Sequence, residues 1–567
     1  IFALSLTLTL TRRPGLTRVV RSGAAALLLP SLAVVVVNVI PRIIETDIVP
    51  AWSGGGGAPV TLPVIATIVA LVLPTTPLIA GSLRRGEVSE DDAASVRRWI
   101  EISAFVTGGI AALLSLVLET PDLSTSLLVF LILGIGAAGA SVFAKRRYGW
   151  WLAAGSWTAA LWCVWGLVGI RDVEPYVYPP AIAAVIIGVV LTLRGRNGAS
   201  LVAPGLAIAI VTSLVVLAVS GSGHDPSDED AALPWRAIAL LAASTVLLLI
   251  GVALMRGFER LRPLCLTALV TSIGAASAGT VQAVRYAWEL DDLGLGHPDL
   301  VVWPVLTFSV VAAILAASAG RYLTGAGRWA QVPAVAFLVV GPIAAVAPGV
   351  APMWVLWALM FVLLGLMLVT VVRALGSLEG GEPTILPPTW VVFLAAWCVA
   401  VAGWSVRDLN VEWFSLPLGL ALVGAGVLVL RRGAVGQRGT LTSWPVGFMR
   451  SWAVLAPGIV VTVLPSVLAT GTNPATWRAI LVLGLALVAL LVGALLRYAA
   501  PFVLSLVTFG VEILVILVVL VAGRDIDPVV FYVAAGAAGI ILITVAIWFE
   551  RRSRGDGATS ARMRDLR

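Results

Sequence analysis

Long apolar runs recur from one end of the chain to the other, and they constrain its fold more than any other feature. Each run reaches the length of roughly 18 residues at which a helix crosses the hydrocarbon core of a bilayer. Because lipid offers no hydrogen-bond partners, each crossing segment must satisfy its own backbone as a helix. The charged fraction is 12%, against about 25% in soluble domains. The sequence therefore predicts an all-α polytopic transmembrane bundle and excludes a soluble multidomain protein.

Polar, glycine-rich or proline-rich segments separate the apolar runs and set the expected helix boundaries. We predict about eighteen transmembrane helices. They cover residues 22–40, 59–82, 100–118, 125–144, 149–170, 177–193, 199–220, 233–255, 263–284, 300–319, 329–347, 352–372, 387–406, 413–430, 450–469, 476–496, 499–522 and 529–549.

The basic residues lie mainly in alternate loops, and this orients the predicted bundle. With a cytoplasmic N-terminus and eighteen crossings, 30 of the 37 Lys and Arg residues fall on the inner side. Such an excess over short loops is the positive-inside pattern, so we expect a multi-pass protein of the cell membrane with both termini in the cytoplasm. The inner arginines then face anionic headgroups, and we expect membrane lipids as partners rather than nucleic acid.

Five of the seven outer basic residues recur at a nearly constant spacing. They are Arg42, Arg171, Arg285, Arg407 and Arg524, separated by 129, 114, 122 and 117 residues. An acidic residue follows each arginine within four positions. A fixed period of this length, holding four helices, predicts internal repeats. Since four is an even number, every repeat enters the membrane in the same orientation, so the repeats are parallel.

Four repeats are complete in this interpretation. They cover residues 43–171, 172–285, 286–407 and 408–524. Residues 1–42 hold the first helix as an incomplete unit, which we interpret as the end of a lost preceding repeat. Residues 525–567 hold the last helix and a basic cytoplasmic tail. Parallel repeats occur in transporters, but this pattern alone does not favour transport over a scaffolding role.

The remaining two outer arginines indicate a second, eight-helix period. Arg236 and Arg478 both lie in the tetrapeptide Trp-Arg-Ala-Ile, at 235–238 and 477–480. Two interpretations suit the seven outer arginines. Each can extend to the headgroups and pair there with its neighbouring acid, as a membrane anchor. Alternatively, they form cationic sites that bind a phosphate or carboxylate group.

Glu512 is the one acidic residue that this topology leaves near the middle of the bilayer. A carboxylate costs at least about 2.5 kcal/mol there, so the protonated form is favoured and the side chain should face the protein interior. In the first interpretation, its proton bonds a neighbouring hydroxyl or carbonyl group. In the second, Glu512 is a proton-coupling or substrate-contacting group in an internal cavity.

Residues with catalytic or metal-binding chemistry are scarce. The two histidines, His224 and His297, lie in polar loops. The three cysteines lie inside apolar runs without a Cys-x-x-Cys spacing. We therefore predict no catalytic residue, no metal site and no cofactor. Whether the protein is an enzyme stays open, with the negative answer favoured.

Small residues and prolines inside the spans bear on helix packing. Glycines at 134–139 and 424–426 predict close contacts between helices. Several prolines are expected to break their helices, as in the discontinuous helices of transporters. They are Pro74, Pro77, Pro342 and Pro465.

Four segments resemble the C-terminal part of a family of large actinobacterial polytopic membrane proteins of unknown function. They read YPPAIAAVIIGVVLTLR at 178–194, SWAVLAPGIVVTVLPSVLA at 451–469, WRAILVLGLALVALLVGALLR at 477–497 and APFVLSLVTFGVEILVI at 500–516. The resemblance implies a multi-spanning helical region and no particular activity. Family members often carry a cytoplasmic zinc ribbon, and this sequence lacks the cysteine pairs for one.

Three function classes follow from these patterns. The first is transport or lipid handling across the cytoplasmic membrane. The alternative is a structural or assembly scaffold that binds no substrate, and a second alternative is a membrane enzyme that acts on a lipid-linked substrate. The scarcity of charges at mid-depth favours an uncharged or lipidic cargo, or none.

Overall fold

The computed structural model is helical, and the residues that it describes contain no strand. It describes residues 1–11, 17–45, 58–86, 88–117, 123–221, 234–257, 259–290, 298–323, 327–346, 353–378, 386–405, 410–432, 440, 442–523 and a few positions between 527 and 539. The chain divides into two compact units, residues 1–183 and 184–567. The predicted all-α polytopic fold is confirmed, whereas the finer boundaries of the four-helix repeats stay a prediction.

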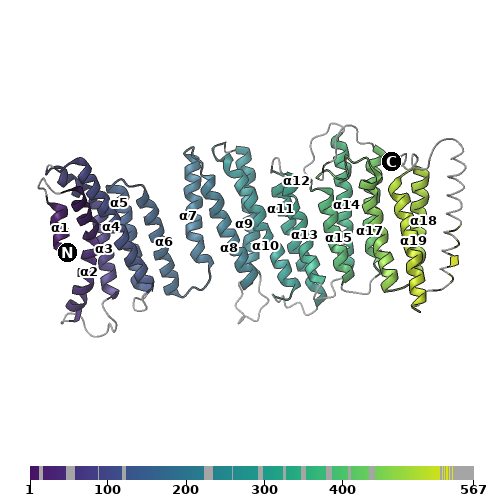
Figure 1. Ribbon diagram of the computed structural model, residues 1–567, viewed down its shortest axis with the longest axis horizontal. Coiled ribbons are helices and arrows are strands. Elements are labelled where there is room, and N and C mark those ends of the chain that lie inside the picture. Colours follow the sequence, from purple (N-terminus) through teal and green to yellow (C-terminus); the bar gives the residue numbers. More distant parts are fainter. Residues whose placement is uncertain are drawn as a thin grey trace. The chain divides into compact units, whose positions relative to one another are not determined.

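The first unit holds six complete helices in its described residues (Figure 1). They are α1 (Phe2–Leu10), α2 (Arg18–Glu45), α3 (Ala58–Arg84), α4 (Glu90–Val117), α5 (Leu123–Phe143) and α6 (Tyr148–Val168). The next helix, α7 (Glu174–Leu193), crosses the boundary between the units.

The second unit continues with helices that pass back and forth between two sets of loops (Figure 1). They are α8 (Ala199–Ser220), α9 (Trp235–Gly257), α10 (Cys265–Ala287), α11 (Val302–Gly320), α12 (Gly327–Ala330), α13 (Val332–Val346), α14 (Met353–Leu378), α15 (Thr389–Ser405), α16 (Glu412–Arg432), α17 (Ser451–Thr472), α18 (Thr476–Leu496) and α19 (Ala499–Val521). Short 3₁₀ turns at Glu259–Leu264 and Pro298–Val301 precede α10 and α11.

Sixteen of the predicted spans correspond to helices that are long and apolar enough to cross a membrane. The predicted span 387–406 corresponds to a shorter apolar helix, Thr389–Trp404. The last predicted span, 529–549, lies almost wholly outside the described residues. The structure adds α1, which the sequence interpretation did not assign because its nine residues are too few to cross a bilayer.

α4 begins ten residues before its predicted start. Its first turn holds Glu90, Asp91 and Asp92, and the amide of Asp92 donates to the Ser89 hydroxyl at 3.2 Å. A serine before the first turn caps free backbone amides, and acidic side chains there oppose the positive end of the helix dipole. Polar residues therefore extend this helix beyond its apolar span, and apolarity alone misplaces the start.

The expected helix breaks at proline are wrong. α3 runs through Pro74 and Pro77, α13 through Pro342, and α17 through Pro465. A proline removes its own backbone hydrogen bond, but neighbouring helices and the bonds on either side hold a transmembrane helix together. Pro465 leaves the carbonyl of Val461, four residues earlier, without that usual donor.

Glycines bring several helix pairs to backbone contact. A Cβ added at Gly136 would lie 2.4 Å from the Cα of Ala70, and one at Gly134 would lie 2.4 Å from the ring of Trp157. A Cβ added at Gly426 would lie 2.8 Å from the carbonyl oxygen of Val454. The predicted close packing is confirmed at these three positions. It is wrong for Gly424, where an added Cβ would have no atom of a neighbouring helix within 4 Å.

Two pairs of glycine contacts recur at corresponding places inside the second unit. Gly188 of α7 faces Val202 of α8, and Gly426 of α16 faces Leu455 of α17. These two targets occupy matching positions before the Ala-Pro-Gly sequence of α8 and α17. Likewise, Gly251 faces Leu269 and Gly493 faces Phe502, each glycine 15 residues after the arginine of its Trp-Arg-Ala-Ile segment. The recurrence supports the predicted eight-helix period, which stays a prediction.

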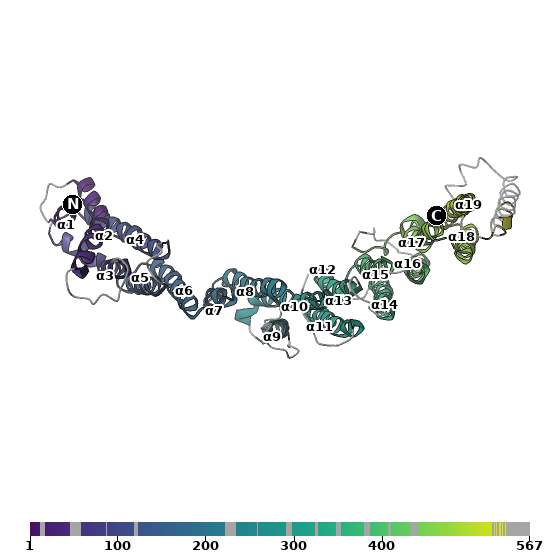
Figure 2. The same cartoon turned by 90° about the horizontal axis from the view of Figure 1, so that it is seen from below.

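Extensive helix contacts join elements that are close in chain order. α10 packs on α8, α9, α11 and α13, and α19 packs on α17 and α18. The view from below shows α17, α18 and α19 close together (Figure 2). A bond that spans more of the chain runs from the guanidinium of Arg328 to the carbonyl oxygen of Thr442 at 3.1 Å. The described bundle is thus held mainly by sequence-local helix pairs.

Candidate functional site

The outer arginines do not share one environment. Arg171 is exposed after α6, whereas Arg236 is half-buried and donates to the carbonyl oxygen of Gly221 at 3.3 Å. Arg285 is 8% exposed and donates to the carbonyl oxygen of Ala218 at 2.7 Å. The side chain of Arg42, and the whole of Arg407 and Arg524, lie outside the described residues.

Arg478 is the most buried of the outer arginines that the structure describes, with 3% exposure. Its Nε donates to Oε1 of Glu412, its Nη2 lies 3.5 Å from Oε2, and the two form a buried ion pair. Nη1 donates to the carbonyl oxygens of Asn473 and Ala469, at the C-terminal end of α17. The guanidinium also lies 5.5 Å from the ring centre of Trp477, within cation–π range.

These contacts give three of the arginines a structural role at helix ends. Carbonyl groups at a helix end lack intrahelical donors and carry the negative end of the dipole. Arg285 and Arg236 satisfy such groups at the end of α8, and Arg478 satisfies them at the end of α17. Arg285 and Arg478 are buried, and both interpretations of the outer arginines, as headgroup anchors or as cationic binding sites, stay predictions.

Glu512 lies on α19, which packs against the α18 helix of Arg478. It is fully buried, at 0% exposure. The hydroxyl of Thr470, on α17, is 3.0 Å from Oε1 of Glu512, on α19. Oε2 of Glu512 is buried and has no hydrogen-bond partner among the described residues. The side chain therefore faces the protein interior, as expected, and half of its carboxyl group lacks a partner.

An apolar cleft adjoins the Arg478 contacts. It has a volume of about 410 Å³ and lies between α15 and α17. It is lined by Trp397, Trp404, Val411, Val460, Val461, Leu464, Pro465, Leu468, Ala469 and Thr472. Nine of these ten side chains are apolar, and Ala469 supplies a carbonyl oxygen to Arg478 as well as a wall of the cleft.

The indole nitrogen of Trp404 is a polar feature beside this apolar lining. It is buried and has no acceptor among the described residues. An indole N–H is a donor only, and a buried donor without a partner carries a free-energy cost of about 1–3 kcal/mol. The Trp404 N–H is buried, so the accessible surface of the cleft is hydrocarbon-like.

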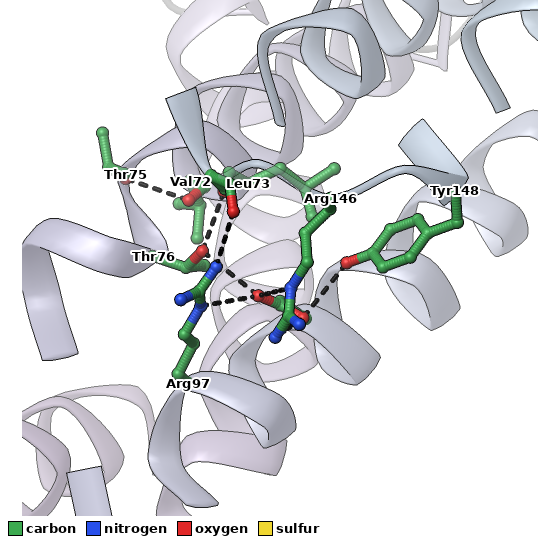
Figure 3. A network of polar contacts seen from close by, with 9 residues as sticks. Val72, Leu73, Thr75, Thr76, Arg97, Arg146 and Tyr148 are labelled. Atoms are coloured by element: carbon green, nitrogen blue, oxygen red, sulfur yellow. Dashed lines mark hydrogen bonds and ion pairs between the residues drawn. The ribbon is translucent and has the colours of Figure 1, made fainter. Parts of the chain in front are cut away.

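A second ion-pair network lies in the first unit and centres on Glu101 of α4, a buried residue. Arg97 and Arg146 both donate to Oε1, at 3.0 and 3.1 Å, and the Tyr148 hydroxyl donates to Oε2 at 3.1 Å. Figure 3 shows Arg97, Arg146 and Tyr148 converging from α4, the turn after α5 and the start of α6. The hydroxyl of Thr76, on α3, lies 3.5 Å from Oε1.

The turn between α5 and α6 places Arg146 in this network. Lys145 has a φ of 54°, a left-handed conformation that is uncommon outside glycine. The chain reverses there, so Arg146 returns toward α4, and Arg97 donates to the carbonyl oxygen of Ala144 at 3.0 Å. The network thus connects the turn between α5 and α6 to α4, and we interpret it as a structural contact that stabilises this turn.

Sequence reasoning did not single out Glu101 or Glu412. For Glu101, a signal was present, since Arg97 precedes it by four residues, a spacing that brings two side chains together on a helix. For Glu412, the partner Arg478 is 66 residues away, so no local pattern marks the pair. The described residues hold no cluster of three or more His, Cys, Asp or Glu side chains suited to a metal ion, and His224 and His297 lie outside them.

Comparisons with known proteins add no family. No family model, no curated protein and no solved structure matches the chain. The resemblance to actinobacterial membrane proteins therefore stays a prediction. The described residues contain sixteen long apolar helices, which pack through small residues and pair ionic groups inside the bundle. These features identify the chain as a polytopic integral membrane protein.

Proposed function

We propose that this membrane protein binds and handles a lipid or a similar amphipathic molecule at the cleft between α15 and α17. The observation that carries the proposal is the cleft itself. Its volume of about 410 Å³ lies within the range of small-molecule sites, about 300–1,000 Å³. A site of this kind is mostly apolar and has few polar groups, which fix the orientation of the ligand.

The position of the cleft favours a lipidic occupant. Leu464 and Leu468 line it and are also 49% and 62% exposed on α17, a helix apolar enough to span a membrane. In a bilayer, exposed side chains of such a helix meet acyl chains, so the molecule available to the cleft is a lipid. An acyl or isoprenoid chain would fill this apolar space.

A scaffold without a substrate is the competing proposal. Glycine contacts such as Gly136 against Ala70 serve close packing in either case, so they do not separate the two. The scaffold predicts that lipids contact all exposed spans equally. Lipid handling predicts a preferred contact at the cleft. We find no residue arrangement in the described chain that favours the enzyme alternative.

Replacing Leu464 by tryptophan is expected to fill the cleft and reduce lipid contact there several-fold. The measurement uses the full chain in nanodiscs that contain a phospholipid with a diazirine in one acyl chain. After irradiation, mass spectrometry compares the yield of lipid adducts on residues 460–472 between the wild type and the variant.

Leu491→Trp is the matched control, because Leu491 lies on α18 and is 50% exposed, almost as exposed as Leu464. It should leave adducts on residues 460–472 unchanged. Uniform labelling of all exposed spans in the wild type, with no effect of Leu464→Trp, would refute lipid handling at the cleft and favour the scaffold.

We also propose that both chain ends face the cytoplasm. The basic asymmetry of 30 to 7 motivates this orientation, and the structure supports its alternation of sides. Arg97 and Arg146, assigned to the inner side, share Glu101. Glu412 and Arg478, assigned to the outer side, form an ion pair.

Single cysteines test this orientation after the three native cysteines are replaced. A cysteine in the loop 222–232 should react with an impermeant maleimide on intact cells, and one after residue 552 should react only after the membrane is permeabilised. The reverse result, with the tail labelled and the loop protected, would contradict the proposed orientation.

A further inference from the structure

We infer that the carboxyl group of Glu512 holds one exchangeable monovalent cation, either a proton or Na⁺, inside the membrane-spanning bundle. This site is separate from the lipid cleft, and the inference does not depend on what the cleft binds. It rests on the charge balance of the buried cluster, on the unpartnered oxygen of Glu512 and on the hydrogen bonds of Thr470.

The buried cluster on α16–α19 carries one uncompensated negative charge when Glu512 is ionised. Glu412 and Arg478 neutralise each other through direct contact. The remaining donors of Arg478 are directed to the carbonyl oxygens of Ala469 and Asn473, although its charge also acts on Glu512. An isolated buried carboxylate is too costly to persist unpaired, so a cation must accompany it.

The other groups near Glu512 supply hydroxyl oxygens and one charge, that of Arg478, which is already paired with Glu412. Within the described residues, α19 packs mainly against α17 and α18. From α17 comes the hydroxyl of Thr470, with that of Ser466 one turn earlier, and from α18 the charged group is Arg478. Ser505 lies about two turns before Glu512 on α19. The hydroxyls of Ser466 and Ser505 are buried and, like Oε2 of Glu512, lack hydrogen-bond partners among the described residues.

The hydrogen bonds of Thr470 allow two states. Its hydroxyl lies 3.0 Å from the carbonyl oxygen of Ser466 and 3.0 Å from Oε1 of Glu512. A hydroxyl has a single proton to donate. When Glu512 is protonated, it donates to Thr470, and Thr470 donates to Ser466. When Glu512 is ionised, Thr470 donates to Glu512, and the unpartnered Oε2 is left to ligate Na⁺. Rotation of one hydroxyl thus serves both forms.

The two other glutamates that are buried in the described part of the chain, Glu101 and Glu412, lack this property. Glu101 contacts Arg97 and Arg146, and Glu412 contacts Arg478. Their charges are already balanced by arginine, which stays protonated in proteins. They provide internal controls, since neither requires a mobile cation.

A hydrophobic carbodiimide tests the site in the full chain in detergent or nanodiscs. Dicyclohexylcarbodiimide adds to a protonated carboxyl group within an apolar environment, and peptide mass spectrometry locates the adduct. We expect modification of Glu512, while Glu101 and Glu412 stay unmodified in the same sample. Reactions are run from mildly acidic to mildly alkaline pH, with NaCl or with choline chloride at equal ionic strength.

Three outcomes separate the sources of the cation. Loss of labelling as pH rises, on the order of tenfold per unit beyond the titration, with no effect of sodium, assigns a proton. Protection by NaCl but not by choline chloride at constant pH assigns Na⁺. The inference is overturned if labelling of Glu512 is the same at every pH and in both salts, or if Glu512 is not labelled in any condition.

Thermal unfolding provides a second readout that does not depend on access of the reagent. A cation that binds the folded state raises Tm as its concentration increases, so the wild-type Tm should rise with acidity or with Na⁺. Glu512→Gln replaces the carboxyl group by a neutral amide of the same shape and should abolish that dependence. Thr470→Val should weaken it. An equal dependence in the wild type and in Glu512→Gln contradicts the inference.

Discussion

Replacing Arg478 by leucine is expected to lower the free energy of unfolding by about 3–5 kcal/mol, the cost of leaving one partner of a buried ion pair without the other. Glu412 is 3% exposed and would remain in the bundle without its counter-ion. The carbonyl oxygens of Ala469 and Asn473 would lose their donor as well. Reversible unfolding in mixed micelles, titrated with a denaturing detergent, measures the change.

Two variants control this experiment. Glu412→Gln combined with Arg478→Leu removes the stranded charge, so the double variant should regain part of the lost stability. Arg236→Leu changes the arginine at the matching position of the other Trp-Arg-Ala-Ile segment, where the side chain is half-buried and donates to Gly221. Its cost should be about 1 kcal/mol. Equal costs for Arg478→Leu and Arg236→Leu would show that the buried pair is not exceptional.

Glu101→Gln is expected to cost about 2 kcal/mol and to loosen the turn between α5 and α6. The change leaves Arg97 and Arg146 without a counter-ion, but their side chains are 24% and 38% exposed. Water therefore screens part of the charge, and the cost falls below that of a fully buried pair. Hydrogen exchange of the backbone amides at 144–148 should accelerate more than exchange within α2.

Glu90→Gln is the matched control in the same helix. Glu90 pairs with Arg84 at 3.5 Å, and these side chains are 81% and 51% exposed. Exposed pairs of this kind contribute little, so neither stability nor exchange at 144–148 should change measurably. If Glu101→Gln changed stability and exchange at 144–148 as little as Glu90→Gln, the Glu101 network would not stabilise the turn.

Most of the fold was predictable because a bilayer makes length and apolarity decisive. Sixteen predicted spans correspond to apolar helices of sufficient length, and the errors come from other physics. The first turn of α4 is polar and helical because of a serine cap and acidic residues. α3 continues through Pro74 and Pro77, because packing offsets one missing hydrogen bond in a long helix.

The candidate site was predictable only where a single residue conflicts with its surroundings. Glu512 is an acid within an apolar run, and its burial follows from that conflict. The pairing of Glu412 with Arg478, and of Glu101 with Arg146, depends on how separate helices pack. The cleft between α15 and α17 has no sequence signature, because the space left between two helices depends on the shapes of many apolar side chains.

The local order of helix packing has a consequence for biosynthesis. Extensive contacts join helices that are neighbours or near neighbours along the chain, as α9 with α10 and α18 with α19. Contacts at short sequence separation form early, because little chain entropy is lost in closing them. Each helical hairpin can therefore pack while the ribosome is still translating the next one. Few helix surfaces in the growing chain then stay unpacked until a distant part of the sequence is made.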